Sequence, residues 1–125
     1  MASLYAQTSG THSTNSTSYV PIPGLSFQLP EGVGAMAIVT LNVPYPYATG
    51  NNYPGGMFAL TVNGKQLAPV AGFSYSVQNG NNRIPTTLVI GVPLTMTKQV
   101  VAAVWQNVRG STVMMDSPAT LSAIY

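Results

Sequence analysis

Apolar residues alternate with polar or small residues over short stretches of this chain, and Pro or Gly interrupts every apolar run. Alternate residues of a β-strand point to the same face, so this pattern is typical of half-buried strands. We find no segment with the i, i+3, i+4 apolar stripe of an amphipathic helix. The predicted strands cover residues 36–43, 58–62, 65–68, 73–77, 86–92, 100–108, 112–115 and 120–125.

These segments predict an all-β domain of about eight to ten short strands, a pattern typical of sandwiches and jelly rolls. Asn63-Gly64 separates two of the strands. Both residues accept positive φ, so the pair indicates a tight hairpin. No change in composition divides the 125 residues, which suit one domain. We expect residues 1–18 to form a flexible polar arm or an edge strand, and residues 19–125 to form the domain.

The chain is 46% hydrophobic but only 5% charged, against about 25% charged in an average soluble domain. So little charge on so apolar a chain suggests that a partner covers part of its surface, and a second copy is the natural candidate. The four basic side chains are scattered and form no cluster for phosphates. We therefore expect no nucleic-acid partner.

The chain has no cysteine, which excludes disulfides and thiolate metal sites. No apolar run approaches the roughly 20 residues of a membrane span, so we expect no membrane insertion. The first five residues lack the basic and apolar regions of a secretory signal. This predicts a cytoplasmic protein as synthesised, with release or surface exposure by a non-classical route left open.

Catalysis lacks suitable side chains. Glu31, Asp116 and His12 are the candidates for acid–base chemistry or metal binding. A glycosidase usually needs two carboxylates beside one bond, and calcium needs several carboxylate oxygens. Glu31 stands in a Pro-Glu-Gly turn, and Asp116 precedes a Ser-Pro turn where it can bind backbone N–H groups. We therefore predict no enzyme activity, no metal and no cofactor.

The loops offer groups that suit a neutral polar ligand. Residues 44–55 form a turn-rich connection with three tyrosines, although such rings more often pack than bind. Ser74 and Tyr75 lead into a polar loop that ends at Arg83. Trp105 and Arg109 are four residues apart, so a continuous strand would place them on one face. Arginine presents several N–H donors in a planar fork, which suits sugar hydroxyls.

At these residues the chain resembles a known family. Its segments 19–25, 41–55, 108–111, 116–117 and 121–124 are similar to the tumour-necrosis-factor-like, fucose-binding amino-terminal lectin domain of Burkholderia-type bacterial superlectins. The resemblance covers residues 19–125. It implies a TNF-like jelly-roll β-sandwich that assembles as a homotrimer. It also implies a metal-independent lectin that binds L-fucose and fucosylated, blood-group-type glycans between protomers.

The resemblance also implies a division of roles among site residues. The arginines would bind sugar hydroxyls and the ring oxygen, the tyrosines would add hydroxyl contacts, and Asp116 would orient an arginine. Which of Gly80, Asn81 and Asn82 contacts the sugar stays open. The implied fucose-binding residues are Tyr47, Ser74, Tyr75, Asn81, Asn82, Arg83 and Arg109, and the supporting residues are Met57, Trp105 and Asp116.

The chain departs from the family at three places. Met57 stands where family members have a tyrosine, Met114 stands where relatives have a histidine, and the loop before Arg83 is about two residues shorter. These changes bear on longer glycans more than on the monosaccharide. The alternative hypothesis is a structural jelly-roll subunit of capsid or adhesin type without a sugar site, because low charge and self-association fit that class equally well.

Overall fold

The computed structural model describes residues 1–80 and 82–125, and this part of the chain contains strands but no helix. It therefore has no helix that could cross a membrane. The eleven strands are β1 (Ser3–Gln7), β2 (His12–Thr14), β3 (Val20–Leu29), β4 (Met36–Val43), β5 (Tyr47–Thr49), β6 (Gly55–Val62), β7 (Lys65–Ser74), β8 (Thr86–Pro93), β9 (Gln99–Val108), β10 (Thr112–Met115) and β11 (Thr120–Ile124).

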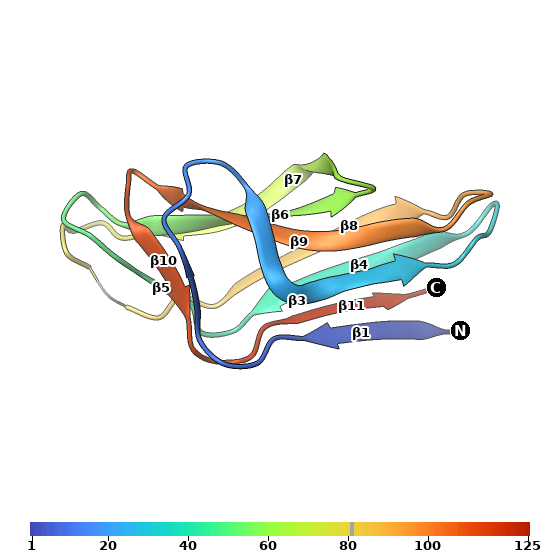
Figure 1. Ribbon diagram of the computed structural model, residues 1–125, viewed down its shortest axis with the longest axis horizontal. Coiled ribbons are helices and arrows are strands. Elements are labelled where there is room, and N and C mark those ends of the chain that lie inside the picture. Colours follow the sequence, from blue (N-terminus) through green and yellow to red (C-terminus); the bar gives the residue numbers. More distant parts are fainter. Residues whose placement is uncertain (81) are drawn as a thin grey trace.

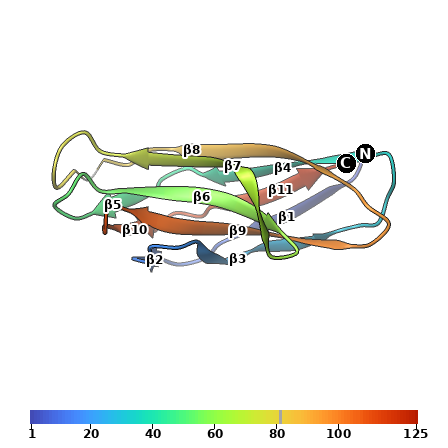
Figure 2. The ribbon, with the colours of Figure 1, turned by 90° about the horizontal axis from the view of Figure 1, so that it is seen from above.

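The strands form two four-stranded antiparallel sheets and one small sheet. The orders are β1-β11-β4-β8, β3-β9-β6-β7 and β2-β10-β5. The two large sheets run along the long axis of the molecule and form a jelly-roll sandwich (Figures 1 and 2). The small sheet lies toward one end, and both termini lie toward the other (Figure 1).

The alternation seen in the sequence forms the core of the sandwich. Along β8, the side chains of Leu88, Ile90 and Val92 are buried while the residues between them are exposed. Strand β4 follows the same pattern and pairs with β8 in register from Met36↔Pro93 to Val43↔Thr86. Successive residues of a strand point to opposite faces of the sheet, so the sheet that contains β4 and β8 has one buried and one exposed face.

Strand β3 is absent from the sequence prediction because its segment contains two prolines and a glycine. Proline lacks an N–H and is tolerated mainly in edge strands or at bulges. Both conditions hold here: β3 pairs only with β9, and its register shifts between Pro21 and Ser26. Gly24 has a φ of 85°, which suits a residue without a side chain.

The predicted hairpin is present, but one strand prediction needs correction. Asn63 and Gly64 have φ values of 51° and 81° and connect β6 to β7. The predicted strands 65–68 and 73–77 belong to one longer strand, β7, which ends at Ser74. Within residues 1–18, β1 and β2 pair at sheet edges, so the described chain has more strands than the eight to ten predicted.

Four aromatic rings lead from the middle of the core toward the end with the small sheet. The ring centroids of Trp105 and Phe58 are 6.3 Å apart, those of Phe58 and Phe73 are 6.4 Å apart, and those of Phe73 and Tyr75 are 5.8 Å apart. Offset or tilted pairs at such distances stabilise a core beyond simple burial. They extend the packed core toward the loops at this end.

Candidate functional site

Most of the sequence-predicted site residues that the structure describes lie toward the end of the sandwich opposite the termini. The β5–β6, β7–β8 and β9–β10 connections meet there (Figure 1). Within one chain several of these residues form two groups, each built around one arginine. We call them the Arg109 pocket, lined by Met57, Gly72, Phe73, Ser74, Val108 and Arg109, and the Arg83 cluster, formed by Tyr45, Tyr47, Arg83 and Asp116.

Arg109 stands in a tight turn after β9. It has a φ of 53° and is followed by Gly110 with a φ of 71°, so the strand ends at Val108. The prediction that a continuous strand places Trp105 and Arg109 on one face is therefore wrong, because Arg109 lies in the turn. Trp105 is 1% exposed and belongs to the core, whereas Arg109 is exposed.

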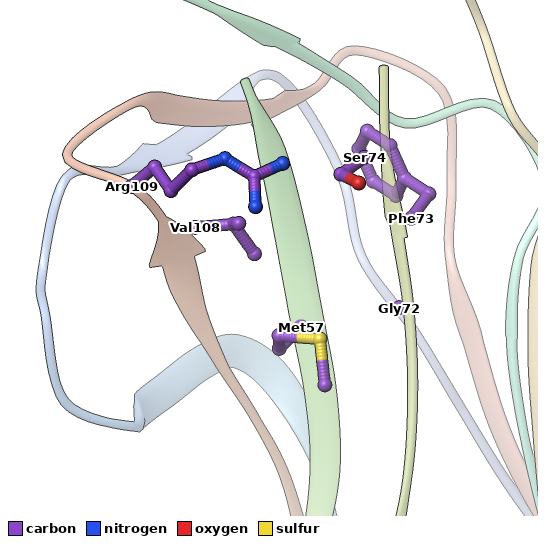
Figure 3. Close-up of a pocket in the computed structure, with 6 residues that line it drawn as sticks. All are labelled: Met57, Gly72, Phe73, Ser74, Val108 and Arg109. Atoms are coloured by element: carbon purple, nitrogen blue, oxygen red, sulfur yellow. The ribbon is translucent and has the colours of Figure 1, made fainter. Parts of the chain in front are cut away.

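Backbone oxygens hold the Arg109 guanidinium. Its Nε donates to the carbonyls of Tyr53 and Asn52 at 3.1 and 3.3 Å, and Nη2 donates to Tyr53 at 2.9 Å. The guanidinium carbon lies 6.0 Å from the centre of the Tyr53 ring. Tyr53 itself has a φ of 50°, so an unusual backbone turn presents its carbonyl. These contacts leave the other edge of the fork directed along the pocket (Figure 3).

The Arg109 pocket is an open hollow of about 390 Å³. Figure 3 shows Arg109 and Ser74 toward one end of it and Met57 toward the other. Glycines permit this packing: a Cβ on Gly55 would lie 2.2 Å from the Phe73 carbonyl oxygen, and one on Gly72 would lie 2.7 Å from the Gly56 carbonyl oxygen. Each separation is far below van der Waals contact, so strands β6 and β7 need glycine at both positions.

Ser111 is a residue that sequence reasoning missed as part of the pocket's support. It is 3% exposed. Its Oγ accepts from the Gly55 N–H at 3.1 Å and lies 2.9 Å from the Gly55 carbonyl and 2.7 Å from the Val108 carbonyl. Ser111 thereby ties the Arg109 turn to the start of β6. Only the fold brings Gly55 and Ser111 together across 56 positions.

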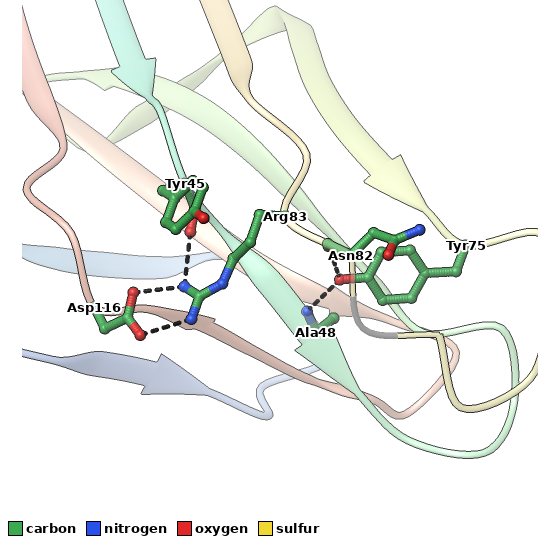
Figure 4. A network of polar contacts seen from close by, with 6 residues as sticks. All are labelled: Tyr45, Ala48, Tyr75, Asn82, Arg83 and Asp116. Carbon is green, nitrogen blue, oxygen red and sulfur yellow. Dashed lines mark hydrogen bonds and ion pairs between the residues drawn. The ribbon is translucent and has the colours of Figure 1, made fainter.

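The Arg83 cluster is built from side chains. Nη1 and Nη2 of Arg83 donate to the two carboxylate oxygens of Asp116 at 2.5 and 2.9 Å, and Nη1 also donates to the Tyr45 carbonyl at 3.2 Å (Figure 4). The guanidinium carbon lies 4.7 Å from the Tyr45 ring centre and 4.0 Å from that of Tyr47. This forked geometry is the strongest arrangement of arginine with a carboxylate. Asp116 is therefore placed to orient an arginine, and that arginine is Arg83.

The ion pair shifts both ionisation equilibria. The hydrogen bond from Arg83 lowers the pKa of Asp116 below its ordinary 3.8. The same bond raises the pKa of Arg83, so both groups stay charged at neutral pH. Their side chains remain 30% and 36% exposed. The pair thus removes most of the net charge of the cluster but leaves it at the surface.

Tyr75 lies beneath the surface. It is 5% exposed, and its hydroxyl accepts from the Ala48 N–H at 3.0 Å and donates to the Asn82 carbonyl (Figure 4). Burial raises the pKa of this phenol. Tyr75 therefore joins β5 to the loop before Arg83, and its direct contact with a sugar stays a prediction. Asn82 is exposed, and Asn81 lies outside the described residues.

The two groups offer different chemistry to a ligand. The Arg109 pocket combines N–H donors and a hydroxyl with an apolar wall, the combination that small-ligand sites use. The Arg83 cluster presents two tyrosine rings against a guanidinium that is paired with the Asp116 carboxylate. The structure brings together Met57, Ser74 and Arg109 in one group and Tyr47, Arg83 and Asp116 in the other. Tyr47, Asn82 and Arg83 are not among the residues that line the Arg109 pocket.

The described residues contain no cluster of potential metal ligands. Across 1–80 and 82–125, no three His, Asp or Glu side chains gather closely enough to hold an ion. His12 bonds to the Ser9 carbonyl at 2.8 Å through Nε2. Glu31 lies in the loop after β3, and Asp116 follows β10 toward the opposite end of the molecule (Figure 1).

The fold is a jelly roll, and the family to which the sequence belongs makes it a lectin-type domain. The model of the Bc2l-C N-terminal domain family matches residues 3–124, and the chain belongs to this family. The match confirms the resemblance that the sequence carries to the TNF-like lectin domain. It also reaches further than residues 19–125, because it includes strands β1 and β2. No protein of curated function matches the chain by sequence.

Solved structures agree on the fold. The Eiger TNF of S. frugiperda is 11% identical with a TM-score of 0.55, and the match covers 97% of this chain and 90% of that one. The insecticidal delta-endotoxin Cry8Ea1 of Bacillus thuringiensis is 13% identical with a TM-score of 0.50 over 91% of this chain. This chain spans only 19% of the endotoxin's length. At such identities the likeness concerns the fold alone, which is a TNF-like jelly roll.

Proposed function

We propose that this protein is a metal-independent lectin for L-fucose and fucosylated, blood-group-type glycans, with sites shared between neighbouring protomers of a homotrimer. One observation carries the proposal: among the predicted sugar contacts, Ser74 and Arg109 line the Arg109 pocket, whereas Tyr47 and Arg83 belong to the Arg83 cluster. Each group alone is open to solvent and supplies part of a site. Two neighbouring subunits would complete it by placing the Arg83 cluster of one over the Arg109 pocket of the other.

The chemistry of the two groups suits a monosaccharide. A sugar ring has hydroxyls on its rim and C–H groups on its faces, so it needs fixed donors beside apolar surface. The free edge of the Arg109 fork and the Ser74 hydroxyl offer such donors, while Met57 and Val108 offer apolar surface. Hydrogen bonds to a charged group contribute about 1.5–3 kcal/mol each. A single site of this kind would bind in the micromolar to millimolar range.

The exposed face of the β1-β11-β4-β8 sheet supports assembly. Its side chains include Tyr5, Met36, Ile38, Val89 and Ile124, which are 40–64% exposed in the single chain. An adjoining apolar hollow of about 290 Å³ is lined by Met1, Ile38, Ile124 and Tyr125. Several exposed apolar side chains on one sheet face of a chain with so little charge are typical of a covered surface. We propose that neighbouring copies cover it.

The experiment is a glycan array followed by calorimetric titration with methyl α-L-fucoside. We expect signal on fucosylated glycans and saturable binding of the fucoside in EDTA. Light scattering should give a mass about three times the 13.1 kDa of the chain. No response to any fucosylated glycan would refute the lectin proposal, and a monomer that binds fucoside normally would refute the shared site.

Catalysis has no support in this arrangement. Asp116 is occupied by Arg83, and Glu31 lies toward the other end of the sandwich. A glycosidase would need two carboxylates on either side of one bond. We therefore propose binding without turnover, and release of fucose from any fucoside would contradict this.

A further inference from the structure

Met57 forms an apolar wall of the Arg109 pocket. It pairs with Gly72 across β6 and β7, and its thioether reaches over the place where a side chain on Gly72 would stand (Figure 3). A Cβ at Gly72 would lie 2.3 Å from the Met57 sulfur and 2.7 Å from the Gly56 carbonyl oxygen. The missing side chain of Gly72 is therefore what lets Met57 lie against β7.

The opposite end of the pocket is polar. Arg109 and Ser74 lie there, and the contacts with the Asn52 and Tyr53 carbonyls hold the guanidinium in place. A ligand in this pocket meets donors on one side and a thioether on the other. A thioether sulfur is only a weak acceptor. A hydroxyl pressed against it would lose water without gaining a strong hydrogen bond, whereas a methyl group would gain contact area.

We propose that Met57 determines specificity: it selects a ligand that turns a methyl group toward β7, and so a 6-deoxy sugar over the same sugar with a 6-hydroxyl. This inference rests on the proposed function and names the part of the sugar that Met57 recognises, which is its methyl group. An apolar pocket discriminates against an added hydroxyl only moderately, by up to about a hundredfold. We expect methyl α-L-fucoside to bind about tenfold to a hundredfold more tightly than methyl α-L-galactoside.

The test is a titration of the assembled protein with both glycosides. Met57→Gln keeps the length of the side chain but adds an amide that can bond to a hydroxyl. We expect this variant to lower the fucoside-to-galactoside ratio at least threefold, chiefly by improving galactoside binding. Met57→Leu keeps an apolar side chain and should therefore keep the preference for the fucoside. Val70→Gln is the matched control, because it adds the same amide to an exposed position of β7 outside the pocket, and it should leave the ratio unchanged.

Two results would overturn the inference: equal binding of the two glycosides by the unaltered protein, or an unchanged ratio in Met57→Gln. Circular dichroism and light scattering check that each variant folds and assembles. If Met57→Gln does not fold, Met57→Thr is the second polar variant, because threonine suits a strand. If the unaltered protein binds no fucoside, the proposed function fails. If it binds fucoside but Met57 does not affect the ratio, only this inference fails.

Discussion

The two arginines of this chain lie at the same end of the sandwich and are held in opposite ways. Arg83 is held mainly by side chains, because the Asp116 carboxylate binds its fork and the rings of Tyr45 and Tyr47 lie against it; one backbone carbonyl, that of Tyr45, also accepts from it. Arg109 is held by a turn of the main chain and by the carbonyls of two loop residues. The position of Arg83 thus depends on a titratable partner, whereas that of Arg109 depends on backbone geometry.

The largest expected effect is on binding through Arg109. Arg109→Ala removes the fork that faces the pocket, and with it about two hydrogen bonds to a charged group. We expect methyl α-L-fucoside affinity to fall about a hundredfold or more, with the assembly intact. Titration and light scattering measure both quantities. Lys65→Ala, a cation at the β6–β7 turn, is the control, and normal binding by Arg109→Ala would show that the site is assigned wrongly.

The next effect is on the turn that carries Arg109. Ser111→Ala leaves the Gly55 N–H without its buried partner, so we expect the free energy of unfolding to fall by about 1–3 kcal/mol. Fucoside affinity should fall as well, since the turn loses its link to β6. Denaturant unfolding and titration are the measurements. Ser26→Ala, at an exposed position of β3, is the control, and equal stability of the two variants would remove Ser111 from the support of the pocket.

The Arg83 cluster should respond to the loss of its carboxylate charge. Asp116→Asn can no longer accept both N–H groups of the fork, so Arg83 loses its fixed orientation. We expect about a threefold to tenfold loss of fucoside affinity and little change in stability, because exposed ion pairs contribute little to folding. Asp116→Ala should behave alike. If both variants bind as the unaltered protein does, the contrast between the two arginines has no functional meaning.

The smallest effect is a dependence on pH that belongs to the Arg83 cluster alone. The pKa of Asp116 is lowered in the folded protein, so the stabilisation from the ion pair is complete above its ordinary value of 3.8. It is lost as the pH falls through the lower folded value. We expect fucoside binding to be constant from pH 7 to about pH 5 and to weaken below 3.8, and Asp116→Asn to lack this decline. A decline of equal size in both proteins would assign the titration to another group.

Much of the fold follows from local pattern. The alternation along β4 and β8 and the Asn63-Gly64 turn are properties of neighbouring residues, and the structure contains all three. Strand β3 could not be predicted in this way, because its prolines are acceptable only where the chain lies at the edge of a sheet. Likewise, the sequence shows only that Tyr75 is an aromatic residue near a loop. Its burial could not be predicted, because it depends on contacts with β5 and with the chain near Asn82.

By itself the sequence determined the all-β class, the family, the shortage of charge and the presence of two arginines beside tyrosine-rich loops. Each of these depends on residue type or on spacing along the chain. Only the tertiary structure decided that Arg83 pairs with Asp116, 33 positions away, that Ser111 secures the Arg109 turn from 56 positions away, and that Met57 lies over a glycine of the next strand. These contacts join residues that are distant in the chain, and a contact of that kind exists only once the sheets have paired in register.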